Sequence, residues 1–384
     1  MVPIFILAHF GHHLTTALFQ PLTPFIRDDF NLDYTQIGWI MSAYTIAYGL
    51  SHLPAGWLSD RLGPRLMIFI GISGVALVAI LIGLAPTYLS LVTFMILMGV
   101  VGGGYHPSSS PLVAASVGKK SQGRALGLHQ LGGTASFFLT PLIAVAIAGA
   151  IGWRGSFITL SIMVFIIGIV LFIILGKRGY TRKSPEVSAS NQDVTPETSG
   201  GMRRLVPFVT LAVIFQIMLI SVITYIPLFA VDSLKASEQT SALLFSTIHF
   251  AGLWAGPIGG YLSDRLGKVP VMLTVVLIAC PVLYLLSISS LGWGIWIALL
   301  LLGACMYMSM PVTEAYIIAH SPKRRRSTIL GIYYFASRGG PGLVIPLVGT
   351  LADRYSFATS FTVVGGVVLL TGIVCAALLW SSRG

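Results

Sequence analysis

The sequence has very few charged residues. Asp, Glu, Lys and Arg make up 9% of its 384 residues, whereas hydrophobic residues make up 55% and the mean hydropathy is +0.88. A soluble domain carries about 25% charged residues, and a bilayer-spanning helix needs about 20 predominantly apolar residues. The composition therefore excludes a soluble globular protein and predicts an all-α membrane protein.

Two further scarcities limit the possible functions. Only three cysteines occur (Cys280, Cys305 and Cys375), all in apolar runs, so we interpret them as packing residues rather than disulfides or ligands. The net charge of +11 comes from short basic clusters between apolar runs, without the aromatic and basic surface of nucleic-acid-binding proteins. We therefore expect no nucleic-acid partner and no cofactor.

Twelve apolar runs, bounded by turn residues and charges, are long enough to span a membrane. Met1–Pro3 lead directly into the first run without the basic start of a signal peptide, so we interpret that run as a retained transmembrane helix. The predicted spans are 3–26, 35–58, 66–85, 88–117, 123–150, 154–176, 204–231, 238–262, 269–290, 292–319, 327–352 and 357–380.

Basic residues are distributed unevenly between the loops. Most of the 23 Lys and Arg residues lie in one alternating set of loops, whereas the opposite loops hold only Arg27, Arg154, Lys235 and Arg354. The positive-inside rule places the basic set in the cytoplasm. Both termini are then cytoplasmic, and an even number of spans, twelve, crosses the inner membrane.

A charged eight-residue segment occurs twice. Gly56–Gly63 reads GWLSDRLG and Gly260–Gly267 reads GYLSDRLG, and the same offset places Pro107 onto Pro311. One register kept over so much chain predicts parallel repeats of six helices each. The predicted domains are two six-helix bundles and a polar cytoplasmic linker, at residues 1–176, 204–384 and 177–203 respectively.

The repeated segment has the composition of a conformational latch. Its glycines let two helix ends approach through a tight turn. Its aspartate and arginine can pair, or interact with helix ends, in one conformation and separate in another. The predicted latch residues are Gly56, Asp60, Arg61, Gly63 and Arg65, with Gly260, Asp264, Arg265 and Gly267 in the second copy.

The pattern Gly56-x-x-x-Asp60-Arg61-x-Gly63-x-Arg65 resembles the signature loop of the major facilitator superfamily. The resemblance implies twelve transmembrane helices in two pseudo-symmetric bundles, which rock about a central cavity open alternately to each side. It also implies that Asp60 helps to stabilise the outward-open state.

Two glycine-rich stretches resemble narrower branches of this superfamily. The stretch 102–107 (GGGYHP) is similar to that of fosmidomycin-resistance-type exporters, and Gly127, Gly132 and Gly133 resemble the glycine-rich antiporter motif. The Gly-Pro pair of that motif is missing from the fifth span and occurs instead as Gly340-Pro341. The direction of transport therefore stays open.

Ionisable residues within a membrane are costly and indicate functional sites. Arg338 is the only basic residue placed deep in a predicted span, and Glu314 is the only acid placed inside one. Arg338 suits an anionic substrate, but it could also pair with Glu314, about 12 Å away in depth, or extend towards water. We predict Arg338 and its face neighbour Tyr334 as substrate-binding, and Glu314 as proton-coupling.

Histidines form a second polar group in the predicted spans. Three of them, at a spacing of i, i+3 and i+4, form one stripe of the first span with Thr16 and Gln20. Because histidine titrates near neutral pH, a cavity lined by it could carry protons, although neutral hydrogen-bonding histidines are the alternative. The stripe histidines are His9, His12 and His13; we predict His12 and His129 as proton-coupling, and His13, Gln20, His106 and His249 as substrate-binding. No metal site is predicted, because no carboxylate or cysteine joins the His-x-x-His-His motif.

The predicted function is proton-coupled secondary transport of a small organic molecule, anionic if Arg338 binds it. Polyspecific drug or antibiotic efflux is the main alternative, and transport without protons stays open. A membrane enzyme or sensor is a further class, but the spans show no nucleophile–base set and no carboxylate-rich site, so no enzyme is predicted. We expect a monomer whose partners are substrate, protons and membrane lipid.

Overall fold

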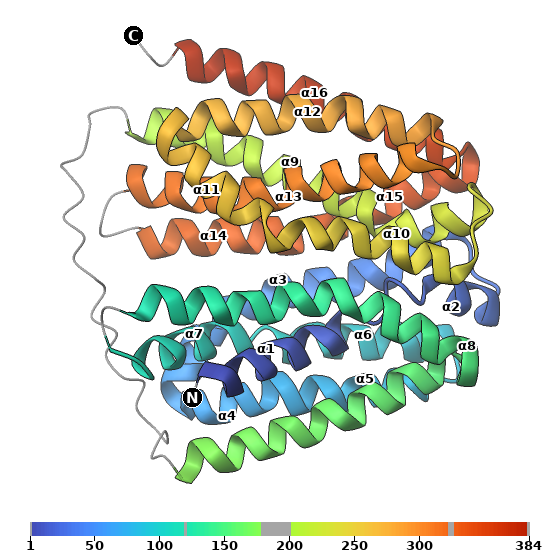
Figure 1. Cartoon of the computed structure of the whole chain (residues 1–384), viewed down its shortest axis with the longest axis vertical. Helices are drawn as coiled ribbons and strands as arrows, with labels where there is room; N and C mark the ends of the chain where they lie inside the picture. Colours follow the sequence, from blue (N-terminus) through green and yellow to red (C-terminus); the bar gives the residue numbers. More distant parts are fainter. Residues whose placement is uncertain (1, 119–120, 178–200, 322–325, 382–384) are drawn as a thin grey trace. The chain divides into compact units, whose positions relative to one another are not determined.

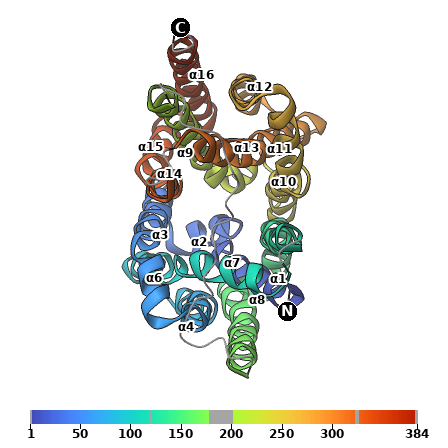
Figure 2. The same cartoon turned by 90° about the vertical axis from the view of Figure 1, so that its left-hand side faces the viewer.

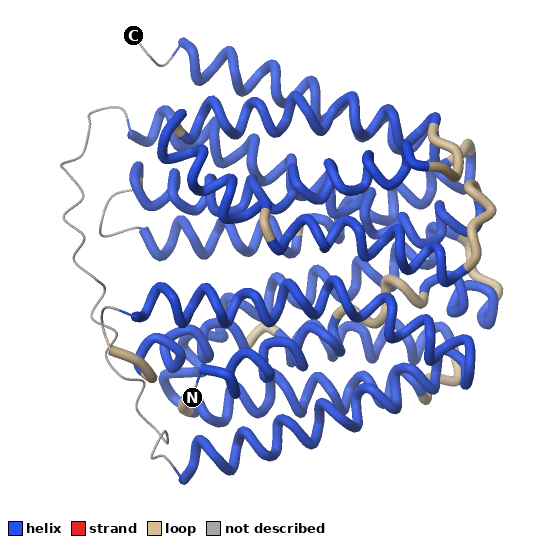
Figure 3. The backbone as a smooth tube through the Cα atoms, in the orientation of Figure 1, coloured by secondary structure: helices blue, strands red, loops and turns tan. Residues whose placement is uncertain are grey.

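The computed structural model describes residues 2–118, 121–177, 201–321 and 326–381. Within these ranges the chain forms helices joined by short loops, without strands (Figure 3). It divides into unit 1, Met1–Leu32 with Trp39–Asn191, and unit 2, Asp33–Gly38 with Gln192–Gly384. The predicted all-α fold is confirmed, whereas most of the predicted linker 177–203 lies outside the described residues.

In unit 1, α1 packs mainly against the long helix α8, with further contacts to α5 and α7 (Figure 1). The first residues of α3, up to Gly38, group with unit 2. The elements are α1 (Val2–Thr16), α2 (Thr23–Phe30), α3 (Tyr34–Leu62), α4 (Pro64–Phe69), the π-helical turn η1 (Ile70–Gly74), α5 (Val75–Gly83), α6 (Tyr88–Gly102), α7 (Tyr105–Ala115) and α8 (Gln122–Lys177).

In unit 2, α13 packs mainly against four helices, α9, α10, α11 and α12, as the view along the helices in Figure 2 shows, and it also contacts α14. The elements are α9 (Gly201–Asp232), α10 (Glu238–Phe250), the 3₁₀ turn η3 (Ala251–Leu253), α11 (Ala255–Leu266), α12 (Lys268–Ile288), α13 (Trp293–His320), α14 (Arg326–Gly339), α15 (Pro341–Arg354) and α16 (Phe357–Ser381).

Seven helices of the described chain are long and apolar enough to cross a membrane, or eight if the bent pair α10–α11 forms one span. The count of twelve therefore stays a prediction. The predicted boundary between spans 123–150 and 154–176 coincides with non-helical backbone at Ile151 and Gly152 inside α8.

Two predicted spans are not continuous helices. The span 3–26 is broken between α1 and α2, at Gln20-Pro21, and the span 327–352 is broken between α14 and α15, at Gly340-Pro341. Proline removes a backbone donor and clashes with the preceding turn, so a helix tends to stop just before it.

The duplication extends to helix packing. In unit 1, Gly99 of α6 lies against the carbonyl oxygen of Tyr44 on α3, and in unit 2, Gly303 of α13 lies against that of Ile248 on α10. These pairs have the same offset as the repeated eight-residue segment. A side chain at either glycine would overlap the facing backbone, so both repeats depend on the same close approach.

A second matched contact is a hydrogen bond. The hydroxyl of Ser156 donates to the carbonyl of Ala144 at 2.7 Å, and that of Ser360 donates to the carbonyl of Val348 at 3.3 Å. Each bond joins helical segments that meet near a loop of their own unit. The repeat is therefore visible in packing and in polar contacts, and not only in the sequence.

The close approach at Gly303 predicts a large effect of one methyl group. Gly303→Ala places a Cβ against the Ile248 carbonyl, and overpacking of this kind costs about 1–3 kcal/mol. We expect a lower melting temperature of the purified protein in detergent. The matched control is Gly331→Ala in α14, where an added Cβ meets nothing within 4 Å; equal melting of the two variants would contradict the packing argument.

Candidate functional site

The two predicted latch turns have the same backbone geometry. Gly63, between α3 and α4, has φ 86° and ψ 146°, and Gly267, between α11 and α12, has φ 91° and ψ 150°. This conformation is essentially restricted to glycine. The turn itself therefore requires glycine at positions 63 and 267.

The arginines of the two latch turns also match. The Arg61 guanidinium lies 4.3 Å from the centre of the Trp57 ring, and that of Arg265 lies 4.7 Å from the Tyr261 ring. These cation–π contacts hold each arginine along its own helix. Gly56 and Gly260 directly precede the two aromatic residues, within α3 and α11.

The remaining latch residues make different contacts in the two copies. The Arg65 Nε donates to the Phe172 carbonyl of α8 at 2.9 Å. Asp264 lies 3.7 Å from Lys268, an exposed pair that contributes little to stability. The side chain of Asp60 lies outside the described part of the structure.

Unit 1 brings together five histidines from three segments that are far apart in the sequence. The His9 and His129 rings are stacked with centroids 4.2 Å apart, and the His12 ring stacks on Tyr105 at 4.6 Å. His13 and His106 are half-buried, with ring centroids 5.2 Å apart. The structure therefore joins His9, His12 and His13 of α1 to residues of α7 and α8.

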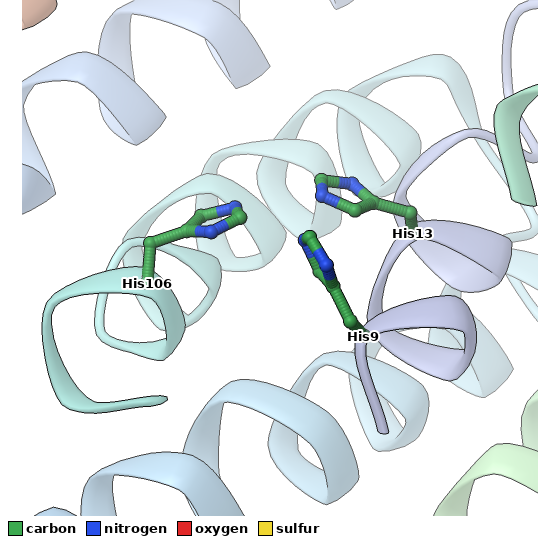
Figure 4. A group of neighbouring side chains, drawn as sticks. All are labelled: His9, His13 and His106. Atoms are coloured by element: carbon green, nitrogen blue, oxygen red, sulfur yellow. The ribbon is translucent and has the colours of Figure 1, made fainter. Parts of the chain in front are cut away.

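Figure 4 shows three of these rings directed towards one another: His9 and His13 from α1, and His106 from α7. One ring nitrogen of each lies within 4.8 Å of the others. The spacing of His9 and His13, one helical turn apart, places them on one face of α1. His106 joins them because α7 begins at Tyr105, directly after the break at Gly103 and Gly104.

Three of the buried histidines are fixed by backbone carbonyls. The Nδ1 atoms of His9, His12 and His129 lie 2.7, 2.6 and 3.1 Å from carbonyl oxygens of His129, Gly71 and Phe5. A carbonyl only accepts, so each Nδ1 carries the hydrogen and each Nε2 is a lone-pair acceptor. Within the described residues, no hydrogen-bond partner reaches these three Nε2 atoms.

Gln20 does not extend the histidine stripe. Helix α1 ends at Thr16, and Gln20 lies half-buried in the following turn. The carbonyl of Gln20 accepts the hydroxyl of Thr23 at 2.8 Å. Helix α1 therefore carries the residues from His9 to Thr16 and ends before Gln20-Pro21. The substrate-binding role of Gln20 stays a prediction.

Unit 2 contains a polar pocket between α9, α13 and α14. Its lining residues are Gln216, Ile220, Met310, Glu314, Tyr333, Tyr334, Ser337 and Arg338. The hydroxyl of Tyr334 donates to the half-buried carboxylate of Glu314. Arg338, exposed one turn further along α14, lies near enough to interact electrostatically with Glu314.

Arg338 and Glu314 line one pocket without forming a direct ion pair. In the described chain, no nitrogen of Arg338 lies within 4.0 Å of a Glu314 oxygen. The Tyr334 hydroxyl forms a hydrogen bond with the carboxylate instead. The pocket thus combines a carboxyl group, a phenol and a guanidinium, which can bind a proton and a polar ligand.

His249 is separate from this pocket but connected to its surroundings. Its Nδ1 lies 2.9 Å from the hydroxyl of Tyr307 on α13. Tyr307 in turn lies near enough to Arg338 to interact with it electrostatically. His249 belongs to unit 2, whereas the other predicted histidines belong to unit 1. The predicted site residues therefore form two groups, one in each unit.

Two residues of the unit 2 site were missed by the sequence predictions. Gln216 lines the pocket and donates to the Ser309 hydroxyl at 3.1 Å. A lone amide in the apolar run of α9 was the available signal. Tyr307 gave no signal, because tyrosines are common at many positions of membrane helices.

Comparisons with known proteins agree with this architecture. Two overlapping matches to the family model of the Major Facilitator Superfamily cover residues 5–252 and 210–384. The chain is 28% identical to Multidrug resistance protein MdtG of Proteus mirabilis (strain HI4320), over 94% of this chain and 91% of the relative. It is 26% identical to the protein of the same name from Escherichia coli (strain 55989 / EAEC), over 96% and 92% of the two chains.

Solved structures share the fold at low sequence identity. A POT family transporter in complex with 5-aminolevulinic acid has a TM-score of 0.85 at 12% identity, covering 100% of this chain and 96% of that chain. A bacterial homologue of the human lysosomal transporter Spinster, inward-facing and occupied, has a TM-score of 0.81 at 14% identity, with the same coverage. The chain is a multi-pass membrane transporter, not an enzyme, and it belongs to the Major Facilitator Superfamily.

Proposed function

We propose that the chain exports small organic molecules of varied structure in exchange for protons. The unit 2 pocket carries this proposal, because it places the carboxyl group of Glu314 in a helix apolar enough to span a membrane. A carboxyl group in that position can bind a proton or a polar substrate group in turn. The full-length similarity to proteins named for multidrug resistance supports outward transport.

The exchange follows from competition at Glu314. When ionised, Glu314 accepts the Tyr334 hydroxyl and attracts a cationic or hydrogen-bond-donating group of a substrate. A proton arriving at Glu314 removes that attraction and releases the substrate. Substrate outward and proton inward are thereby coupled, provided that the pocket faces the two sides alternately.

Proton-coupled transport of an organic anion is a second candidate, and Arg338 favours it. An anion that binds Arg338 takes away the counter-charge of Glu314 and adds a negative neighbour, so Glu314 binds a proton at the same time. The two candidates predict opposite pH dependences of substrate binding. Anion binding strengthens as pH falls, whereas binding of a cation or donor weakens.

The histidines of unit 1 are not assigned to proton exchange in this proposal. His12 and His129 each donate Nδ1 to a backbone carbonyl, which suits a fixed neutral ring. We therefore assign proton exchange to Glu314 and substrate recognition to Arg338, Tyr334 and, through Tyr307, His249. We place the chain in the cytoplasmic (inner) membrane as a monomer with both termini cytoplasmic.

Glu314→Gln tests the coupling role. The amide keeps the shape of the carboxyl group but binds no proton at physiological pH, so we expect export that no longer responds to an imposed pH gradient. The measurement is drug uptake into inverted membrane vesicles with and without the gradient. The control is Glu238→Gln, which removes an acid from the first turn of α10. Unchanged pH dependence in Glu314→Gln would remove Glu314 from the mechanism.

Arg338→Ala separates the two candidates. Hydrogen bonds to a charged group contribute about 1.5–3 kcal/mol, so we expect anionic substrates to bind about 10- to 100-fold more weakly. Neutral and cationic substrates should keep most of their affinity. Binding is measured by thermal shift of the purified protein, with Arg354→Ala at the end of α15 as the matched arginine control. Equal anion binding by Arg338→Ala and the parent protein would exclude the anion candidate.

A further inference from the structure

We propose that His9, His13 and His106 form a binding site for a divalent first-row transition-metal ion in unit 1. The three rings come from two helices, α1 and α7, and point towards one another (Figure 4). Their centroids form a nearly equilateral triangle, with separations of 4.8, 5.2 and 5.2 Å. This site lies outside the unit 2 pocket and is independent of the proposed exchange at Glu314.

The distances lie within reach of coordination. The candidate nitrogens are within 4.8 Å of one another, whereas tetrahedral zinc with Zn–N bonds of about 2.0–2.1 Å holds its nitrogens about 3.3 Å apart. Rotations about χ1 and χ2 move an imidazole nitrogen by this difference. His13 and His106 are half-buried, so an ion can reach the cluster from their side.

His9 has the hydrogen bonding of a metal ligand. Its Nδ1 donates to the His129 carbonyl at 2.7 Å, which fixes the tautomer and leaves Nε2 with a lone pair. Metal-bound histidines typically donate their other nitrogen to a carbonyl or carboxylate in this way. The side chain is 2% exposed, and within the described chain Nε2 has no hydrogen-bond partner. A buried acceptor of this kind calls for a donor or a cation.

A glycine of α8 provides the space for the cluster. A Cβ added at Gly133 would lie 2.8 Å from His9 Nε2 and 2.9 Å from His13 Cδ2. Any larger residue would therefore push both rings out of position. Glycine at this position, on the helix that packs against α1, leaves room for the His9 and His13 rings where they now lie.

The ligand set determines the class of metal. Three neutral imidazoles suit Zn²⁺, Cu²⁺, Ni²⁺ or Co²⁺, whereas Mg²⁺ and Ca²⁺ require oxygen ligands. Three protein ligands leave one tetrahedral position, which a water molecule or an anion occupies. The ion keeps a net positive charge, which a bilayer disfavours. We therefore expect moderate affinity at a half-exposed site rather than the tight binding of a closed structural site.

Metal titration tests the site on the full-length protein without a polyhistidine tag. Chelator-treated protein in detergent is titrated with Co²⁺, whose visible absorption reports tetrahedral nitrogen coordination, and Zn²⁺ then displaces it. We expect one ion per chain and at least tenfold weaker binding by His106→Ala or His13→Ala. The matched control is His52→Ala, which removes another half-buried histidine of unit 1. Loss of affinity in the control equal to that in His106→Ala would overturn the proposal.

Two further measurements do not depend on removing a ligand. Gly133→Ala keeps all three imidazoles and should weaken Co²⁺ binding, whereas Gly127→Ala on the same helix, where nothing lies within 4 Å of an added Cβ, should not. X-ray absorption at the zinc edge of the unmutated protein should give three imidazole nitrogens and one further ligand atom from water or an anion. A shell made only of oxygen, or one containing sulfur, would exclude this site.

Discussion

Close helix approach at glycines is the constraint on which buried polar contacts in both units depend. In unit 2, Gly303 lets the backbone of α13 meet the Ile248 carbonyl of α10. The next turn of α13 carries Tyr307, and the residue after Ile248 is His249, so the close approach brings their side chains within 2.9 Å. A larger residue in place of Gly303 would separate the helices and break that bond as well as the packing.

The same constraint acts in unit 1 with different residues. Gly71 has room for no side chain, because an added Cβ would lie 2.8 Å from Tyr105. Its carbonyl, within the π-helical turn η1, accepts His12 Nδ1 at 2.6 Å. A π-helical turn disturbs the regular backbone pattern and is often found at functional sites. Glycine and local backbone irregularity together decide where a histidine can be buried.

The two repeats share their packing but not their chemistry. At the offset that aligns the close-approach glycines, His106 corresponds to Met310, Glu314 to Ser110 and Arg338 to Thr134. At each of these positions, the ionisable or ligating residue of one repeat corresponds to an apolar or small hydroxyl residue in the other. The two repeats therefore share their helix packing but differ in their polar sites. The site in unit 1 consists of imidazoles, and the site in unit 2 contains a carboxyl group and a guanidinium.

The sequence predicted the features that depend on local pattern. Composition gives the helical membrane fold, the repeated segment gives the duplication, and the spacing of His9 and His13 gives their common face. The meeting of His106 with these residues depends on the break before α7 and on which helices pack together. Neither follows from local spacing, so the cluster could not be predicted from the sequence.

Arg338 and Glu314 show what residue counting along predicted spans can and cannot predict about a contact between two helices. Residue counting from the sequence places Arg338 about 12 Å deeper in its predicted span than Glu314. A direct ion pair was therefore expected to be strained, and the pair is absent within 4.0 Å among the described residues. The counting could not reveal that α9 closes the same pocket with Gln216.

Both sites lie beside helix breaks, and this has a consequence for transport. His13 lies one turn before the end of α1, His106 follows the α6–α7 break, and Arg338 precedes the α14–α15 break. Irregular backbone at membrane depth is tolerated only where protein or a cavity satisfies its polar groups. A break is also where a helix can bend. A ligand bound at such a position therefore restrains the bend directly, so the energy of binding acts on the helix geometry that alternating access must change.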